Sequence, residues 1–201
     1  TDWSLFFGSF HPLIVHIPIG ILLFAALLHS IAAYKKNKTL EFSAGLALLV
    51  GSLGSALAAV SGCFLSVNGG YDAGTLFWHQ WIGIAVAIIS FCAWWIKRNQ
   101  KKNIFFLKAK LSTWLLSVCV LLIIAGGHLG GTLTHGEGYL TAHMPSFLKS
   151  IFPATPREQP QKLPSQLDSV RIYTNIIQPI LHAKCVSCHN PNKQKGDLVL
   201  N

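Results

Sequence analysis

Long apolar runs separated by short polar segments dominate the first two thirds of the chain. Each run contains almost no Lys, Arg, Asp or Glu, and the four lie at about 11–34, 42–67, 75–96 and 111–132. Each is long enough to cross roughly 30 Å of hydrocarbon as a helix of about 20 residues. The pattern therefore predicts an all-α fold, a four-helix transmembrane bundle, in place of a soluble helical core.

The composition agrees with this pattern. Hydrophobic residues make up 51% of the 201 residues and charged residues only 11%, less than half of the roughly 25% that soluble domains carry. The net charge of +9 comes from basic residues clustered between the apolar runs. Membrane topology explains such clusters better than nucleic-acid binding, so we expect the lipid bilayer, and no nucleic acid, as a partner.

The loops predict the direction of the helices. Loops 35–41 and 97–110 carry three and six Lys or Arg residues, whereas the N-terminal segment and loop 68–74 carry none. Positively charged loops stay in the cytoplasm. Both ends of the bundle are therefore expected in the periplasm, with the protein in a bacterial inner membrane.

This direction sorts the histidines by depth. Only His29 falls near the inner end, where we expect an interfacial residue without a special role. Five others are expected at the outer leaflet, from three helices: His11, His16, His79, His128 and His135. Ionisable groups within a membrane are costly and usually functional. The simplest alternative is a hydrogen-bonded polar cap at the mouth of the bundle.

Several ligands suit such a cluster. Neutral imidazole ligates haem iron, and helix bundles hold cofactors between facing helices, so haem b is one hypothesis. Zinc or copper is another. A third is a quinol headgroup, with Glu137 or Asp72 accepting protons at the outer surface.

The spacing of His11 and His16 limits the choice of ligands. Five residues correspond to about 140° around a helix, so both cannot face one point unless Pro12 or Pro18 distorts the turn. We predict that His16 is the buried ligand, facing His79 or His128. His11 would then lie above it at the surface, beside His135.

Three motifs carry a resemblance. HPLIVHIPIG at 11–20, HQWIG at 79–83 and GGHLGGTLTHGEG at 126–138 resemble an uncharacterised bacterial family of four-helix membrane domains, with HPxxVHxP and GGxL…HG motifs. The resemblance covers about 8–140. It implies the fold and no function.

The composition changes after the fourth apolar run. Residues 1–140 are expected to form the membrane domain. Residues 141–169 are expected to form a periplasmic connection, with a mildly amphipathic part followed by a tether at 153–168 that contains four prolines. A third segment, 170–201, carries a different chemistry.

That segment contains Cys185-Val186-Ser187-Cys188-His189, the C-x-x-C-H pattern of covalent haem c attachment. Two thiols at this spacing add to the two vinyl groups of one haem, and the adjacent His189 reaches the iron. Zinc requires four ligands, and no second cysteine pair is present; a disulfide between the two cysteines is the other alternative. Small, buried apolar residues are the expected role of the remaining cysteines, Cys63, Cys92 and Cys119.

The flanking residues carry a second resemblance. IYTNIIQPILHAKCVSCHNPNKQKGDLVL is similar to the planctomycete-type cytochrome c domain, with a short helix ending in PIL and a strand-like KGxLxL piece after CxxCHN. The resemblance implies that Cys185 and Cys188 form the thioethers and that His189 is the proximal iron ligand. Such domains continue for several dozen residues, so we expect 170–201 to be the truncated start of one.

Two functions follow as hypotheses. In the first, the chain is a membrane-anchored cytochrome that passes electrons at the periplasmic face between a haem b or quinol site in the bundle and the tethered haem c. A redox protein or quinol would be its partner, and the chain would be an electron-transfer protein or a subunit of an oxidoreductase complex. In the second, the bundle is an anchor or assembly subunit of a larger membrane complex, with histidines that are structural or bind a metal.

Overall fold

The computed structural model describes most of the chain. The described residues are 3–67, 70–99, 105–136, 138–139, 141, 144–149, 171–186, 189–191 and 193–200. They form two compact units, Thr1–Asn68 with Phe77–Gly127 and Gly69–Leu76 with His128–Asn201.

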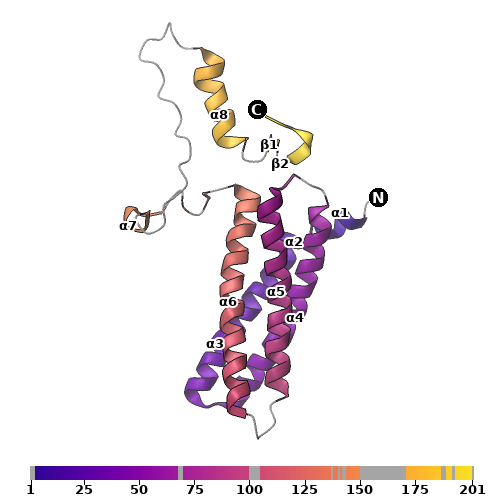
Figure 1. Cartoon of the computed structure of the whole chain (residues 1–201), viewed down its shortest axis with the longest axis vertical. Helices are drawn as coiled ribbons and strands as arrows, with labels where there is room; N and C mark the ends of the chain where they lie inside the picture. Colours follow the sequence, from indigo (N-terminus) through magenta and orange to yellow (C-terminus); the bar gives the residue numbers. More distant parts are fainter. Residues whose placement is uncertain are drawn as a thin grey trace. The chain divides into compact units, whose positions relative to one another are not determined.

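The first unit is a bundle of long helices that alternate in direction (Figure 1). Its elements are α1 (Trp3–Gly8), α2 (His11–Ile14), α3 (His16–Lys35), α4 (Lys38–Ser66), α5 (Ala73–Arg98) and α6 (Phe105–His135), the last two of which continue into the second unit. Four helices are long and apolar enough to cross a membrane: Trp3–Lys35, Lys38–Ser66, Ala73–Arg98 and Lys110–His135. The four predicted spans are thus confirmed. The first begins eight residues before the predicted start, the second ends one residue before the predicted end, and the other ends lie one to four residues beyond those predicted.

Helix α4 starts sharply because Asn37 caps it. The Asn37 side-chain oxygen accepts hydrogen bonds from the backbone N–H groups of Thr39 and Leu40, at 2.9 and 3.1 Å. Such a side chain satisfies donors that have no partner within the first turn of a helix. Lys36, in the left-handed conformation (φ 50°), ends α3 directly before this cap. The α3–α4 turn is therefore short.

Small residues bring α3 and α4 close together. A side-chain Cβ at Gly51 would lie 2.5 Å from Cδ2 of Leu22, which is fully buried. Pro18 of α3 packs in the same way against Gly54, at 3.5 Å from its Cβ position. Small residues at such positions let helix backbones approach closely in membranes. The small residues of α4 therefore allow close packing at these two contacts.

Gly51→Ala is expected to lower the free energy of unfolding by about 1 kcal/mol. Overpacking against Leu22 costs roughly 1–3 kcal/mol, and the higher helix propensity of Ala offsets about 1 kcal/mol of it. Gly20→Ala is the matched control on α3, because no atom lies within 4 Å of its Cβ position. Unfolding in detergent, followed by circular dichroism, checks this. Equal stability of the two variants would contradict the close contact.

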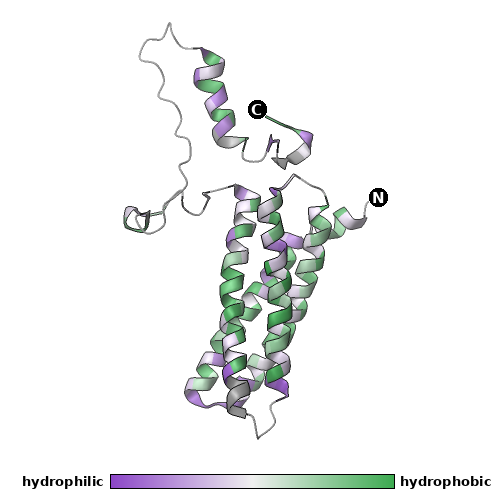
Figure 2. Cartoon of the chain, viewed as in Figure 1, coloured by the Kyte–Doolittle hydropathy of each residue, from purple (hydrophilic) through white to green (hydrophobic). Residues whose placement is uncertain are grey.

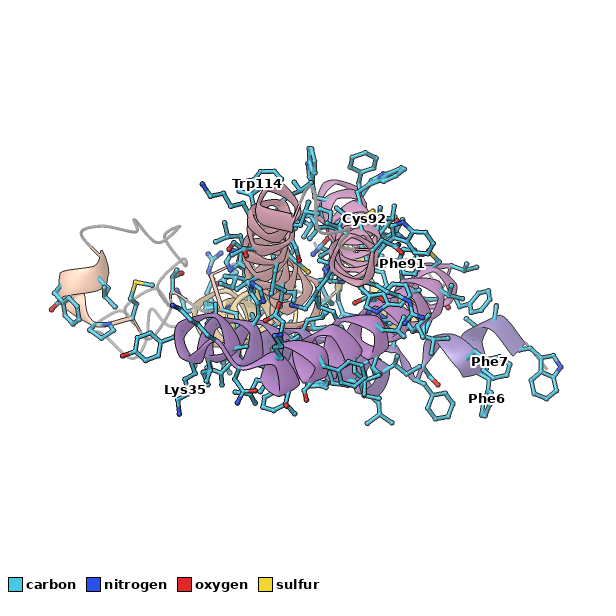
Figure 3. All side chains as sticks on the ribbon, turned by 90° about the horizontal axis from the view of Figure 1, so that it is seen from below. Phe6, Phe7, Lys35, Phe91, Cys92 and Trp114 are labelled. Atoms are coloured by element: carbon cyan, nitrogen blue, oxygen red, sulfur yellow. The ribbon has the colours of Figure 1, made fainter. Side chains whose placement is uncertain are left out.

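The core of the bundle is apolar and lies between all four long helices. It contains Leu22, Ala25, Leu48, Val86, Ala93, Leu116, Cys119 and Ile123. Apolar positions also cover the outside of the helices (Figure 2), and large side chains such as Phe6 and Trp114 lie at the periphery (Figure 3). An apolar outer surface fits a lipid environment.

The three cysteines of the spans do not share one environment. Cys119 is buried in the core, as expected. Cys63 and Cys92 are exposed on the bundle surface, so the prediction that all three are buried is wrong for these two. Their faces of α4 and α5 point away from the helix contacts, where an apolar thiol is as well accommodated by lipid as by protein.

Side chains from all four long helices meet at the end of the bundle that is predicted to be cytoplasmic. Lys97 of α5 donates to the carboxylate of Glu41 of α4 and, at 3.2 Å, to Nδ1 of His29 of α3. The same Nδ1 lies 3.4 Å from Oε1 of Glu41, and Nε2 of His29 lies 2.9 Å from Oγ1 of Thr113 of α6. His29 thus connects helices, and the expectation that it has no special role is wrong.

The second unit contains short elements after α6. These are α7 (Ser146–Lys149), the π-helix η3 (Ile172–Ile177), α8 (Gln178–Lys184), β1 (His189–Asn190), β2 (Lys193–Gln194) and the 3₁₀ turn η4 (Lys195–Asp197). The strands pair antiparallel, His189 opposite Gln194 and Asn190 opposite Lys193. The predicted tether at 153–168 lies outside the described residues.

The segment that resembles a cytochrome differs from expectation at two places. The helix does not end at the PIL triplet but continues to Lys184, one residue before the first cysteine. The expected strand-like piece at KGDLVL is instead the turn η4 followed by residues 198–200 without regular structure. The strand pairing lies earlier, around His189, because Gly196 adopts a left-handed conformation (φ 62°) that interrupts an extended chain.

Candidate functional site

His11 of α2 is held against α4 by its ring nitrogen Nδ1. That atom lies 2.9 Å from the carbonyl oxygen of Ala58 and 3.3 Å from Oγ of Ser61. Glycine 62 makes room for the ring, since a Cβ there would lie 2.9 Å from Cε1 of His11. The half-buried imidazole of His11 therefore fills a notch in α4 that only glycine leaves open.

His79 of α5 is held against α6 in the same manner. Its Nδ1 lies 3.0 Å from the carbonyl oxygen of Gly126. The rings of His79 and His11 are neighbours, with centroids 6.3 Å apart and perpendicular planes. We call these two residues the histidine pair. Each member ties two helices together, α2 to α4 and α5 to α6.

The hydrogen bonds of the histidine pair determine its protonation. A carbonyl oxygen only accepts, so Nδ1 of each ring carries the proton and donates. In a neutral imidazole the other nitrogen, Nε2, then keeps its lone pair. Metal-ligating histidines use the same arrangement, in which a backbone carbonyl fixes the tautomer and orientation of the ring. The histidine pair thus presents two nitrogen donors suited to a metal.

His16 occupies a different environment from the predicted one. Its side chain is exposed, and its Nδ1 donates to the carbonyl oxygen of Pro12 within the same stretch of helix. The prediction that His16 is buried is therefore wrong, and it is His11 that lies beside His79. The role of His16 as a ligand facing His79 or His128 stays a prediction. The two positions are about 140° apart around the helix, and α4 offers its glycine notch to the face that carries His11.

His128 and His135 lie in the second unit, which the structure describes separately from the histidine pair. Both side chains are exposed. The ring of His135 stacks on Tyr139 with centroids 4.1 Å apart, and its Nδ1 lies 2.7 Å from Oγ1 of Thr134. Their role as ligands stays a prediction.

Other polar groups limit what the bundle can bind. Within the described residues, no three His, Cys, Asp or Glu side chains are arranged to hold a metal ion. A zinc site built from four protein ligands therefore has no counterpart in the described part of the bundle.

Gln80, one residue after His79, donates a hydrogen bond to Oγ of Ser66 at 3.0 Å. This contact between α5 and α4 was not predicted from the sequence.

The expected proton acceptors of a quinol site have little support from the structure. Asp72 accepts a hydrogen bond from the backbone N–H of Thr75 at 2.7 Å. This bond lowers the pKa of the Asp72 carboxyl below its ordinary value, which makes the group a poor base. Glu137 lies outside the described residues.

The C-x-x-C-H segment closes one backbone turn between its first and last residues. The N–H of His189 donates to the carbonyl oxygen of Cys185 at 2.9 Å, and the carbonyl of His189 accepts from Leu200 at 2.9 Å. Cys185 is a free thiol, half-buried. Nδ1 of His189 is buried without a hydrogen-bond partner in the described chain. Cys188 lies outside the described residues.

These features fit a haem c attachment. Cys185 and His189 lie one turn apart on a backbone fixed at both sides, so a thioether and an iron ligand can come from the same turn. A buried imidazole nitrogen without a partner is costly, and a bound group or further residues that pair it would remove this cost. The two described residues, Cys185 and His189, therefore suit covalent haem, and the roles of Cys185 and Cys188 as its attachment points stay a prediction.

Comparisons with known proteins address the membrane part. A family model described as "Predicted membrane protein (DUF2231)" matches residues 8–142. No curated protein and no solved structure matches the chain. The family match agrees with the range of the first resemblance, and it ends before the C-x-x-C-H segment, whose likeness to a cytochrome c domain stays a prediction.

Proposed function

The chain belongs to this family of predicted membrane proteins, and on that premise we propose that it is a membrane-anchored c-type cytochrome carrying electrons at the periplasmic face of a bacterial inner membrane. The C-x-x-C-H segment carries the proposal. The histidine pair supports it, because its Nε2 atoms would be free to bind a second centre in the bundle. Electrons would pass between a centre in the bundle, haem b or quinol, and the tethered haem c.

The topology supports the proposal. Haem c is attached outside the cytoplasm, and the positive loops predict that the C-terminal segment lies there. The histidine pair lies toward the same predicted side, at the end of the bundle opposite to Lys97 and Glu41. Both candidate centres thus belong to one side of the membrane, which favours local electron transfer over transfer across the bilayer.

The residues of the C-terminal segment would have defined roles. Covalent haem supplies a one-electron carrier. Cys185 and Cys188 would hold it as thioethers, and His189 would bind its iron through a ring nitrogen. The bond from His189 N–H to Cys185 keeps this turn closed and so orients the imidazole relative to the first attachment point.

The full chain, produced together with a haem c maturation system, is expected to carry one covalent haem. Staining for haem peroxidase activity after denaturing electrophoresis, with pyridine haemochrome analysis, measures it. Cys185→Ala combined with Cys188→Ala should abolish the covalent haem because no thiol remains to form a thioether. Cys92→Ala, which removes an exposed thiol of a span, is the matched control. A fully matured chain without covalent haem would refute the proposal.

A second function has one observation in its favour. The Nδ1 bonds of His11 and His79 join helices, which is what purely structural histidines of an anchor or assembly subunit would do. Reduction of haem c by a short-chain quinol distinguishes the two. Under the electron-transfer proposal the rate falls in His79→Asn; under the anchor function it stays unchanged in a chain that still folds.

A further inference from the structure

The histidine pair has the separation of two ligands on opposite sides of one metal. Metal–imidazole bonds are about 2 Å long, and a ring nitrogen lies about 1 Å from the centre of its ring, so two imidazoles bound on opposite sides of a metal have centroids roughly 6 Å apart. The observed distance is 6.3 Å. Rings in direct contact span roughly 4.5–7 Å, so the distance agrees with ligation and with direct contact alike, and the donors and the free space around the pair decide between them.

The donors around the histidine pair favour an axial pair over a complete ligand set. No third His, Cys, Asp or Glu joins the two in the described chain, and the hydroxyl of Ser61 lies by the protonated Nδ1 of His11. Ions that require four protein ligands are therefore disfavoured. A haem requires only axial donors, since the macrocycle supplies the other four nitrogens, and protein imidazoles are common axial ligands.

The helix that carries His79 has free space on the same face. Gly83 is four residues further along α5, so it lies on the same side of the helix as His79. No atom lies within 4 Å of its Cβ position, although the side chains one turn deeper, beginning with Val86, are buried in the core. A flat ring beside His79 could therefore approach the α5 backbone at Gly83.

From this geometry we propose that His11 and His79 are the two axial ligands of one haem b, bound through Nε2 in the outer half of the bundle. The assignment rests on the proposed electron-transfer function and names its centre in the membrane. Ala58 and Gly126 are positioning residues: their carbonyl oxygens hold Nδ1–H of each ring and so keep both Nε2 atoms available. The proposal favours haem over quinol as occupant.

The test uses the full chain with Cys185→Ala and Cys188→Ala, so that only the bundle can hold haem. A reduced-minus-oxidised spectrum is expected to show low-spin b-type haem. The signal should be lost in His11→Ala and in His79→Ala and kept in His16→Ala and His128→Ala. Absence of the signal, a signal that needs His16 or His128 in place of the pair, or copper without haem would each overturn the proposal.

A conservative variant separates the loss of a haem ligand from misfolding of the chain. His79→Met should still bind haem, now with His and Met as axial ligands, and its midpoint potential should rise because this ligand set raises the potential. An unchanged potential in a haem-loaded His79→Met chain would overturn the role of His79. Circular dichroism and gel filtration of each variant report whether the bundle is folded.

A substitution at Gly83 tests where the haem macrocycle lies. Gly83→Ala meets no protein atom, so the chain should fold as before while its haem content falls, because the methyl group occupies space taken by the ring. Gly20→Ala, equally free of contacts, is the control and should keep its haem. Full haem content in Gly83→Ala would overturn this placement.

The failures of the two proposals are distinguishable. A parent chain with b-type signal but no covalent haem refutes the cytochrome c proposal and leaves the histidine pair as haem ligands. A parent chain with covalent haem whose Cys185→Ala, Cys188→Ala form has no b-type signal refutes the ligand assignment and leaves the tethered cytochrome.

Discussion

Lys97→Met is expected to lower the free energy of unfolding by about 2 kcal/mol. Lys97 is nearly buried, with 9% of its side chain exposed, and it donates to both Glu41 and His29. Breaking a buried ion pair by removing one partner costs about 3–5 kcal/mol. The cost is smaller here because 39% of the Glu41 side chain is exposed, so water can solvate the carboxylate left behind.

The control for this variant is Lys35→Met, which removes the same charge from an exposed position at the end of α3. It should change the free energy of unfolding by less than about 0.5 kcal/mol. Denaturation by sodium dodecyl sulfate, followed by circular dichroism, measures both. Combining Glu41→Gln with Lys97→Met should recover part of the loss, since no charge then lacks its partner. Equal stabilities of Lys97→Met and Lys35→Met would contradict a role of this contact in joining the helices.

This contact also shows which feature of the fold the sequence did not predict, namely the partners of His29 on other helices. The apolar runs predicted the four spans because length and lack of charge act locally along the chain. The partners of His29 lie on three other helices, 12 to 84 residues away, and no local pattern encodes which rotations bring them together. From the sequence, His29 was therefore predicted to be an interfacial residue without partners, although its side chain contacts Glu41, Lys97 and Thr113.

The outer histidines also show that a local pattern does not determine which side chain meets the facing helix. Helical spacing correctly indicated that His11 and His16 could not both face one point. The choice between them depends on the opposite surface, where Ala58, Ser61 and Gly62 of α4 accept the ring of His11. The sequence of α4 contains no histidine and many small residues, which are typical of close helix packing in membranes. Its small residues have a second role, which becomes apparent only when the facing helix is in place.

Gly62→Ala is expected to lower the affinity of the bundle for haem at least about tenfold, the effect typical of disturbing residues that orient a metal ligand. The new Cβ would lie 2.9 Å from Cε1 and 3.1 Å from Nδ1 of His11. The ring has little freedom to retreat, because Nδ1 is bound to Ala58 and lies by Ser61. It must either give up the Ala58 bond or rotate, and either change would move Nε2, which lies 3.5 Å from the same Cβ position.

Gly54→Ala is the matched control on the same helix. Its Cβ would lie 3.5 Å from Pro18, an ordinary contact, so haem affinity should stay within about twofold of the parent. Haem titration of the Cys185→Ala, Cys188→Ala chain, followed by absorbance, measures both variants, and circular dichroism confirms that they fold. Because Gly62 itself offers no donor to a metal, a selective loss in Gly62→Ala means that the orientation of the His11 ring governs binding. Equal affinity of the two variants would show that haem does not depend on the notch that positions His11.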